Sequence, residues 1–409
     1  SQSFTAMGIL ALMEDGEINL TDSIQSHIPS FKVADTNYST QITIQQCLYH
    51  FSGLSIESGA QEKSGETLSE IIEHLAKVKL FAAPGTEYQF SNANYRILGY
   101  LIEQVTGQTY GQFITERILS PLGMNHTYFS YQTATEDPNL AQGYRLWYGI
   151  SLPSRIQYTA ETSPSNGMAS TITDLLIFIR AHLNPENSTY TRDILSPSSF
   201  QLLHTPPTSL TENFTWAMGW YNYTVDGTPY LSISGDLSDY HSEIIINMEL
   251  EVAVVVMINV NSFFGNVGYY QSLASNIMSF VVERSVNKPR FSYFVLYIIL
   301  DLVIFTTVGR EIWKTRKLKS STQTKIDDKF VRKEKVQTLY VELFGHFLTI
   351  ALFLFLLPFL IGFLATMTGF NLGFLALLQP DFLVWIIVIS VIHLSKAVYQ
   401  GIAFREFLK

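Results

Sequence analysis

The sequence has a single cysteine, Cys47, in 409 residues. One cysteine excludes an internal disulfide framework and any metal site built from several thiolates. The nine histidines are scattered, without the spacing of a metal-ligand set, and no glycine-rich phosphate loop is present. We therefore expect neither a metal nor an organic cofactor.

Charged residues are also few, at 15% of the chain, whereas hydrophobic residues reach 47%. Ordinary soluble domains carry roughly 25% charged residues, and disordered chains are more polar still. The net charge of −9 comes from residues 1–290, which are acidic, while the remainder is basic. An acidic front portion argues against a nucleic-acid partner.

The apolar excess is concentrated in three long runs, at about 291–308, 341–365 and 382–404. A helix needs roughly 20 mostly apolar residues to cross the hydrocarbon core of a bilayer. The runs therefore predict three transmembrane helices in a membrane domain at 287–409, preceded by a separate domain at 1–286. The lipid bilayer is then one partner of the protein.

The loop charges predict an orientation. Segment 310–335 contains ten Lys and Arg against four Asp and Glu, and short basic loops stay in the cytoplasm. We expect a multi-pass protein of the plasma (inner) membrane, with domain 1–286 extracytoplasmic and the C-terminus cytoplasmic. The chain starts at Ser1 and not at Met, so we expect that an N-terminal piece has been removed.

Asp301 is the ionisable residue nearest the middle of a predicted span. Ionisable groups are costly in lipid and face other helices or water. His393 and Lys396 are candidate partners, but the sequence does not pair them. The expected role is helix–helix contact; a relay or substrate path is the alternative.

Residues 1–286 mix helical and strand patterns. Apolar periodicity predicts helices over 68–78, 95–106 and 269–282. Two β-branched runs, 242–247 and 252–260, are separated by four residues and predict a β-hairpin. Helices in the first part and strands gathered later indicate an α+β domain.

Several segments of this domain resemble serine β-lactamase-related hydrolases. They span nearly all of residues 1–285 and are specific as a set. They are Ser3-Phe4-Thr5-Ala6, Ile42-Thr43 with Leu48 and His50-Phe51-Ser52-Gly53-Leu54, Pro84-Gly85-Thr86, Phe90-Ser91-Asn92, Pro121-Leu122-Gly123-Met124, and Gly167-Met168-Ala169-Ser170-Thr171 with Asp174.

The resemblance implies a β-lactamase/D-peptidase-like fold, an antiparallel sheet flanked by helices plus an all-helical lobe. The family includes class C β-lactamases, penicillin-binding D-peptidases and esterases. One branch has the layout predicted above. It consists of membrane-anchored peptidases with three C-terminal transmembrane helices, which remove an acyl-D-amino-acid group from prodrug metabolites.

The family's catalytic motifs are altered in this chain. Aligning Ser3-Phe4-Thr5-Ala6 puts Gln2 at the position of the lysine base, so the nucleophilic serine would precede Ser1. The tyrosine position of the second motif is Phe90, whereas its asparagine is retained as Asn92. In the third motif Ile233 replaces a His or Lys, and Gly235 is retained. A positioned base is worth typically 10²–10⁴-fold, and Gln2, Phe90 and Ile233 cannot carry a proton.

An active enzyme would need a substitute base. His241 follows the third motif by several residues, and it is a candidate substitute base if its side chain points toward the cleft. His50 and His126 are weaker candidates, because His50 matches a structural position of the family and His126 follows a surface turn.

Three hypotheses follow. The chain is a membrane-anchored serine hydrolase or peptidase acting outside the cytoplasm, with a degenerate site. Alternatively, it is a non-catalytic pseudoenzyme that binds a peptide, an acyl-D-amino acid, a cell-wall fragment or a partner protein. In the third hypothesis, the membrane domain acts as a transporter or partner dock.

Overall fold

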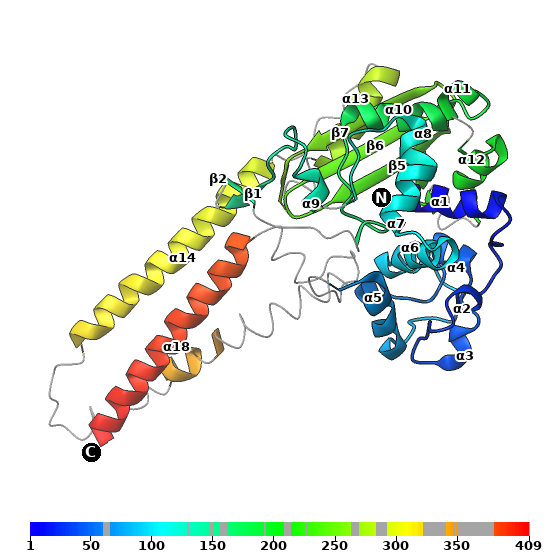
Figure 1. Cartoon of the computed structure of the whole chain (residues 1–409). Helices are drawn as coiled ribbons and strands as arrows, with labels where there is room; N and C mark the ends of the chain where they lie inside the picture. Colours follow the sequence, from blue (N-terminus) through cyan, green and yellow to red (C-terminus); the bar gives the residue numbers. More distant parts are fainter. Residues whose placement is uncertain are drawn as a thin grey trace. The chain divides into compact units, whose positions relative to one another are not determined.

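The computed structural model divides the chain into two compact units (Figure 1). Unit 1 consists of residues 1–142, 155–259 and 271–287; unit 2 consists of 143–154, 260–270 and 288–409. The structure describes residues 1–59, 66–129, 131–147, 150–154, 162–191, 194–207, 214–225, 227–262, 270–283, 293–321, 341–346, 348–349 and 380–408.

Unit 1 contains a five-stranded antiparallel sheet of order β3-β4-β5-β6-β7. Its strands are β3 (Phe214–Trp216), β4 (Tyr221–Val225), β5 (Thr228–Asp236), β6 (His241–Asn247) and β7 (Val252–Ile258). The β6–β7 hairpin is the one that the β-branched runs predict. Its register pairs Ile244 with Val255 and Ile246 with Ala253.

Side chains alternate between the two faces of this sheet. One face, with Ile233, Ile244 and Ile246, joins the main core of the unit. The other face, with Ile245 and Val254, packs against α13 (Gln271–Glu283), which matches the helix predicted at 269–282.

Helices make up the rest of unit 1. Those before the sheet are α1 (Gln2–Glu14), α2 (Ile24–His27), α3 (Thr36–Ser39), α4 (Ile44–Leu48), η1 (Ile56–Gly59), α5 (Leu68–His74), η2 (Leu75–Lys77), α6 (Asn92–Thr106), α7 (Tyr110–Ile114), η3 (Thr115–Leu119), α8 (Ser120–Leu122), α9 (Tyr131–Ala134), α10 (Ile172–Leu183), α11 (Ser188–Thr191) and α12 (Pro197–Leu203).

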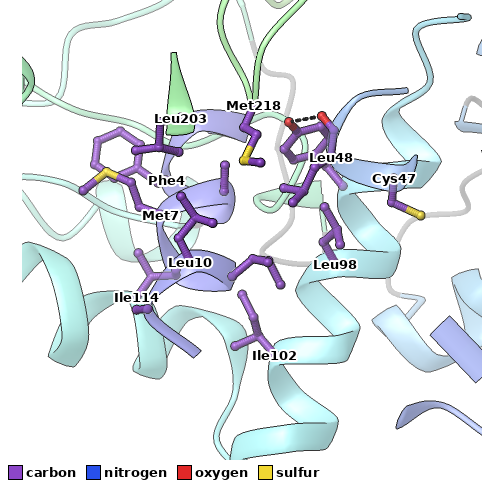
Figure 2. Close-up of a cluster of buried hydrophobic side chains, with 14 of the residues drawn as sticks. Phe4, Met7, Leu10, Cys47, Leu48, Leu98, Ile102, Ile114, Leu203 and Met218 are labelled. Carbon is purple, nitrogen blue, oxygen red and sulfur yellow. Dashed lines mark hydrogen bonds between the residues drawn. The ribbon is translucent and has the colours of Figure 1, made fainter. Parts of the chain in front are cut away.

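Helix α1 is the centre of the main core. Its residues from Gln2 to Leu12 are all buried, because the sequence is apolar on every side, as in a helix enclosed by protein. Figure 2 shows Phe4, Met7 and Leu10 of α1 among side chains of α6, α7 and α12. The Phe4 ring also stacks on Phe178 of α10, with a centroid distance of 4.3 Å.

Local signals fix the helix ends. Thr43 and Thr67 each begin a helix with a capping box, in which the threonine and the third helical residue exchange hydrogen bonds. Helix α6 ends at Gly107, which adopts φ +69°, a conformation that glycine takes without steric cost. The boundaries predicted at 68–78 and 95–106 therefore agree with α5, η2 and the end of α6.

Unit 2 contains a small three-stranded sheet of order β2-β1-β8 and two long helices. Strands β1 (Tyr144–Trp147) and β2 (Ile150–Pro153) form a hairpin, and β8 (Val260–Asn261) pairs with β1 in parallel. This pairing places 143–154 and 260–270 in unit 2, although both segments are inserted within the sequence of unit 1. The helices are α14 (Tyr293–Ser321) and α18 (Pro380–Leu408).

The prediction of three transmembrane helices is wrong for the described part of the chain, where no helix combines the length and apolarity that crossing a bilayer requires. Helix α14 includes Asp301 and a basic second half, so it continues into the predicted loop 310–335, and α18 contains Asp381, His393 and Lys396. Most of the predicted span 341–365 lies outside the described residues, as do residues 322–335 of the loop.

Candidate functional site

Gln2 and Asn92 are brought into contact although 90 positions separate them. Gln2 is the first residue of α1 and Asn92 the first of α6. The Gln2 amide Nε2 donates a hydrogen bond to Asn92 Oδ1 over 3.2 Å. The Gln2 Oε1 atom is buried and accepts no hydrogen bond from the described residues. Gln2 and Asn92, which the resemblance aligns with the first and second motifs, therefore meet as a pair of amides.

The segment containing Gly167 and Met168 meets the same helix end. The backbone N–H of Met168 donates to Ser1 Oγ over 3.3 Å. Gly219 approaches from another side with φ +80°, and a Cβ atom added to it would lie 2.6 Å from the Ser3 nitrogen. Contacts at distances under 3.0 Å force a shift of the backbone, so position 219 requires glycine. The start of α1 is thus enclosed by two loops from distant parts of the sequence.

Phe90 lies just before α6 and packs in an aromatic cluster around His50. The His50 ring centroid is 4.7 Å from those of Phe90 and Trp216, 5.3 Å from that of Tyr95 and 6.1 Å from that of Tyr88. We call these five residues the His50 cluster. Phe90, which the resemblance aligns with the family tyrosine, offers only an apolar ring.

His50 is 1% exposed and adopts φ +60°. Its Nδ1 atom accepts hydrogen bonds from the Ser91 backbone N–H (3.3 Å) and from Asn94 Nδ2 (3.0 Å). Asn94 Oδ1 in turn accepts from Ser52 Oγ at 2.5 Å. These donors fix the neutral tautomer with its proton on Nε2. Burial lowers the pKa of His50 to about 3, so the imidazole is neutral and acts as a structural acceptor.

The third motif lies on β5. Ile233 pairs with Ile244 and Gly235 with Ser242, and both positions point to the face that joins the main core. A Cβ atom added to Gly235 would lie 2.9 Å from Ser242 Oγ. Ile233, which the resemblance aligns with the family's His or Lys, packs against the main core.

His241 faces the other side of the sheet. It pairs in register with Asp236, and strand alternation places both opposite Ile233 and Gly235. The side chain is 1% exposed, and its Nδ1 lies 2.7 Å from Asp236 Oδ1. The structure therefore does not bring His241 to Gln2 and Asn92. His126 lies at the surface, paired with Asp137 at 2.9 Å.

Glu243 is a titratable residue that the sequence interpretation missed. It follows His241 by two positions, so it shares a sheet face with His241 and Asp236, and its side chain is buried. Burial raises the pKa of Glu243 to about 7, and the nearby Asp236 acts in the same direction, although His241 opposes the shift. The available signal was a lone carboxylate at the start of the otherwise apolar run 243–246.

Gln2 and Asn92 bring together two amide groups that donate and accept hydrogen bonds. Gln2, Phe90 and Ile233 have no titrating group, and the Asn92 amide can only donate or accept hydrogen bonds. Among the described residues, no group of three or more His, Cys, Asp or Glu side chains could hold a metal ion.

Comparison with known proteins identifies the family. The β-lactamase family model matches residues 1–274, which is more than half of the chain. The chain therefore belongs to the β-lactamase family, whose members are serine hydrolases and penicillin-binding proteins.

Two curated proteins are among its relatives. "Protein flp" of Staphylococcus aureus (strain MW2) is 30% identical over 265 residues, covering 64% of this chain and 52% of that protein. The "putative penicillin-binding protein PbpX" of Bacillus subtilis (strain 168) is 26% identical over 221 residues, covering 54% and 51%. The chain thus spans about half the length of the curated relatives it matches.

Solved structures confirm the fold. An octameric penicillin-binding protein homologue from Pyrococcus abyssi superposes with a TM-score of 0.58 at 24% identity, covering 69% of this chain and 64% of that one. A class C β-lactamase mutant gives 0.55 at 18% identity, covering 64% and 76%. The predicted β-lactamase-like α+β fold is confirmed, and the layout of the membrane-anchored peptidase branch is not.

Proposed function

We propose that the β-lactamase-family domain is a non-catalytic receptor for an acylated peptide or cell-wall fragment. The observation that carries the proposal is the chemistry of the three altered motif positions. Gln2, Phe90 and Ile233 lie in well-packed surroundings and cannot hold or transfer a proton. Because a catalytic base and its partners act as a unit, loss of one of them removes most of the activity.

The retained polar groups support binding of an amide. Gln2 already donates to Asn92 Oδ1, which leaves the Nδ2 group of the half-buried Asn92 as a donor. The C=O of a peptide unit is the complementary acceptor. The proposed ligand is therefore a peptide or acyl amide, such as an acyl-D-amino acid.

The first test is a thermal-shift screen of the full-length protein, including any residues before Ser1, against acyl-D-amino-acid amides and muropeptides. A ligand at 100 times its Kd stabilises the folded state by about 3 kcal/mol. We expect stabilisation with no product by mass spectrometry. Asn92→Ala should abolish the shift, whereas Asn139→Ala, on the surface, should keep it.

The second test is the intact mass of the full-length protein after incubation with a fluorophosphonate or a penicillin. We expect no adduct on the folded protein. A single adduct on a serine, or turnover of any ligand of the screen, would show a working hydrolase and overturn the proposal. Absence of stabilisation across the whole panel would also contradict it.

A further inference from the structure

His182 and His204 form a hydrogen-bonded pair of imidazole rings inside unit 1, which we call the histidine pair. His182 lies on α10, and His204 directly follows α12. His182 Nδ1 and His204 Nε2 are 2.8 Å apart, so one of these nitrogens donates a proton to the other. His182 is fully buried. Among the described residues, no group forms a hydrogen bond with its Nε2 atom.

Aromatic rings enclose the histidine pair. The His182 ring centroid lies 4.4 Å from that of Phe178, 5.3 Å from that of Phe200 and 5.0 Å from that of Trp220. The Trp220 centroid is also 5.8 Å from that of His204. The titratable side chains of the surrounding elements have other partners: Asp174 and Arg180 of α10, Glu14 of α1, Tyr49 after α4 and Tyr221 of β4. In the described structure, a proton on either ring would therefore be a buried charge with no carboxylate paired to it.

This burial keeps both rings neutral in the folded chain. It lowers the pKa of His204 to about 4. It also lowers the pKa of His182, and a charge on His204 acts in the same direction. An imidazole in water has a pKa of about 6.5. Below that value protons favour any state in which the rings reach water, and the preference grows as the pH falls.

The turn between β3 and β4 is attached to the chain at His204. The backbone N–H of Met218 donates to the carbonyl oxygen of Leu203, the residue before His204, over 3.2 Å. Asn222 Nδ2 donates to the His204 carbonyl over 3.3 Å. Figure 2 shows the side chains of Leu203 and Met218 in the core beside α1. Movement of His204 away from the core would therefore pull on this turn.

The same turn also closes over the start of α1. Residues 217–220 form a tight turn, in which the Ala217 N–H donates to the Trp220 carbonyl over 2.8 Å. Gly219 of this turn approaches the Ser3 backbone so closely that no Cβ atom fits. Ser3 follows Gln2, whose amide pairs with Asn92. The turn thus connects the histidine pair to the amide pair.

We propose that the histidine pair is a proton-sensitive latch, which holds turn 217–220 against the start of α1 while both rings are neutral and releases it when they take up protons. Two protonated rings have four N–H donors and no acceptor, so their shared hydrogen bond is lost and the charged rings move to water. Opening should also weaken ligand binding at the amide pair, a consequence that rests on the proposed function. The latch itself needs no ligand.

Hydrogen–deuterium exchange of the full-length protein tests the latch without a ligand. The readout is the protection of a peptide covering 214–221, which contains the bonded amides of Ala217 and Met218, after correction for the pH dependence of chemical exchange. From pH 6 to pH 5, protection should fall roughly 5- to 10-fold if opening exposes one ring and roughly 50-fold if it exposes both. A peptide of α6, 95–102, reports global unfolding and should stay at least about tenfold more protected at both pH values.

His204→Gln removes a titrating ring, whereas its amide can still donate to His182 Nδ1. In this variant, protection of 214–221 should fall roughly 5- to 10-fold less than in wild type. His74→Gln, at an exposed position of α5, is the matched control and should keep the wild-type fall.

Three results overturn the proposal. The first is wild-type protection of 214–221 that is the same at pH 6 and pH 5, which decides the matter even if His204→Gln does not fold. The second is equal protection of the two peptides, because opening is then global. The third is a folded His204→Gln variant that keeps the full pH dependence. A ligand screen without a hit contradicts the proposed function alone, because the exchange experiment uses no ligand.

Discussion

Acidification should destabilise unit 1 through His50. The pKa of this histidine is about 3 in the folded chain, against a reference value of 6.5. As the pH falls through 6.5, the unfolded chain takes up a proton at His50 and the folded chain does not. The unfolded state therefore binds more protons between these two values. The stability that neutral His50 contributes is complete above pH 6.5 and is lost progressively below it.

The size of the effect follows from the pKa difference. One pH unit corresponds to about 1.4 kcal/mol, so at pH 4.5, two units below 6.5, the loss from His50 is about 3 kcal/mol. Burial also lowers the pKa of His204 to about 4, which adds a loss of similar size. Glu243 acts in the opposite direction, because its pKa is raised to about 7 and its contribution therefore grows as the pH falls. The loss from His50 has to be isolated with a variant.

Urea denaturation of the whole protein at pH 7.5 and pH 4.5 measures this loss. His50→Asn removes the titrating ring, and asparagine tolerates a positive φ better than most residues. The variant should be less stable than wild type at pH 7.5 but should lose about 3 kcal/mol less on acidification. Tyr95→Phe is the matched control, because it removes a hydrogen bond to Leu48 O from the same cluster without removing a group that titrates in this range.

The control should lower stability by about 1 kcal/mol at both pH values. The reasoning is refuted if His50→Asn loses as much stability as wild type between pH 7.5 and pH 4.5.

Three further predictions concern stability. Gly219→Ala should lower the free energy of unfolding by about 2–4 kcal/mol, because its Cβ meets the Ser3 backbone. The control Gly227→Ala, also at positive φ but with no atom within 4 Å, should lower it by about 1–2 kcal/mol. Similar losses in urea denaturation would contradict the close contact. Leu10→Ala, in the middle of the buried helix α1, should cost about 3–5 kcal/mol by leaving a cavity, and a loss under 1 kcal/mol would show that the site collapses. Burial raises the pKa of Glu243 from 4.5 to about 7 in the folded protein, so its contribution to stability falls as the pH rises from 4.5 to 7. Glu243→Gln should therefore stabilise the protein more at pH 8 than at pH 5. A gain independent of pH would contradict the burial of this carboxyl.

Several expectations remain predictions. The domain boundary at 286, the extracytoplasmic location and the cytoplasmic C-terminus were inferred from hydropathy and loop charge, and each rests on those patterns alone. The proposed peptide or cell-wall ligand rests on the amide pair of Gln2 and Asn92.

Local sequence was sufficient where short-range rules decide structure. The runs 242–247 and 252–260 predicted the β6–β7 hairpin because period-two burial and a short connection leave few alternatives. Gly107 ended α6 for a similar local reason. The motif segments identified the β-lactamase family because they recur together. The altered motif positions at 2, 90 and 233 stay predictions of the same resemblance.

Sequence by itself thus determined the family, the β6–β7 hairpin and the helices that correspond to α5, α6 and α13. The tertiary structure alone decided which side chains meet. It brought Gln2 into contact with Asn92 and enclosed His50 among aromatic rings. It also placed His241 on the sheet face opposite Ile233 and paired Lys396 with Glu311. The physical reason is that contacts between distant residues depend on strand register and helix packing. A shift of one residue in register moves every side chain of a strand to the other face of the sheet. The patterns that predict helices and strands extend over only a few neighbouring residues.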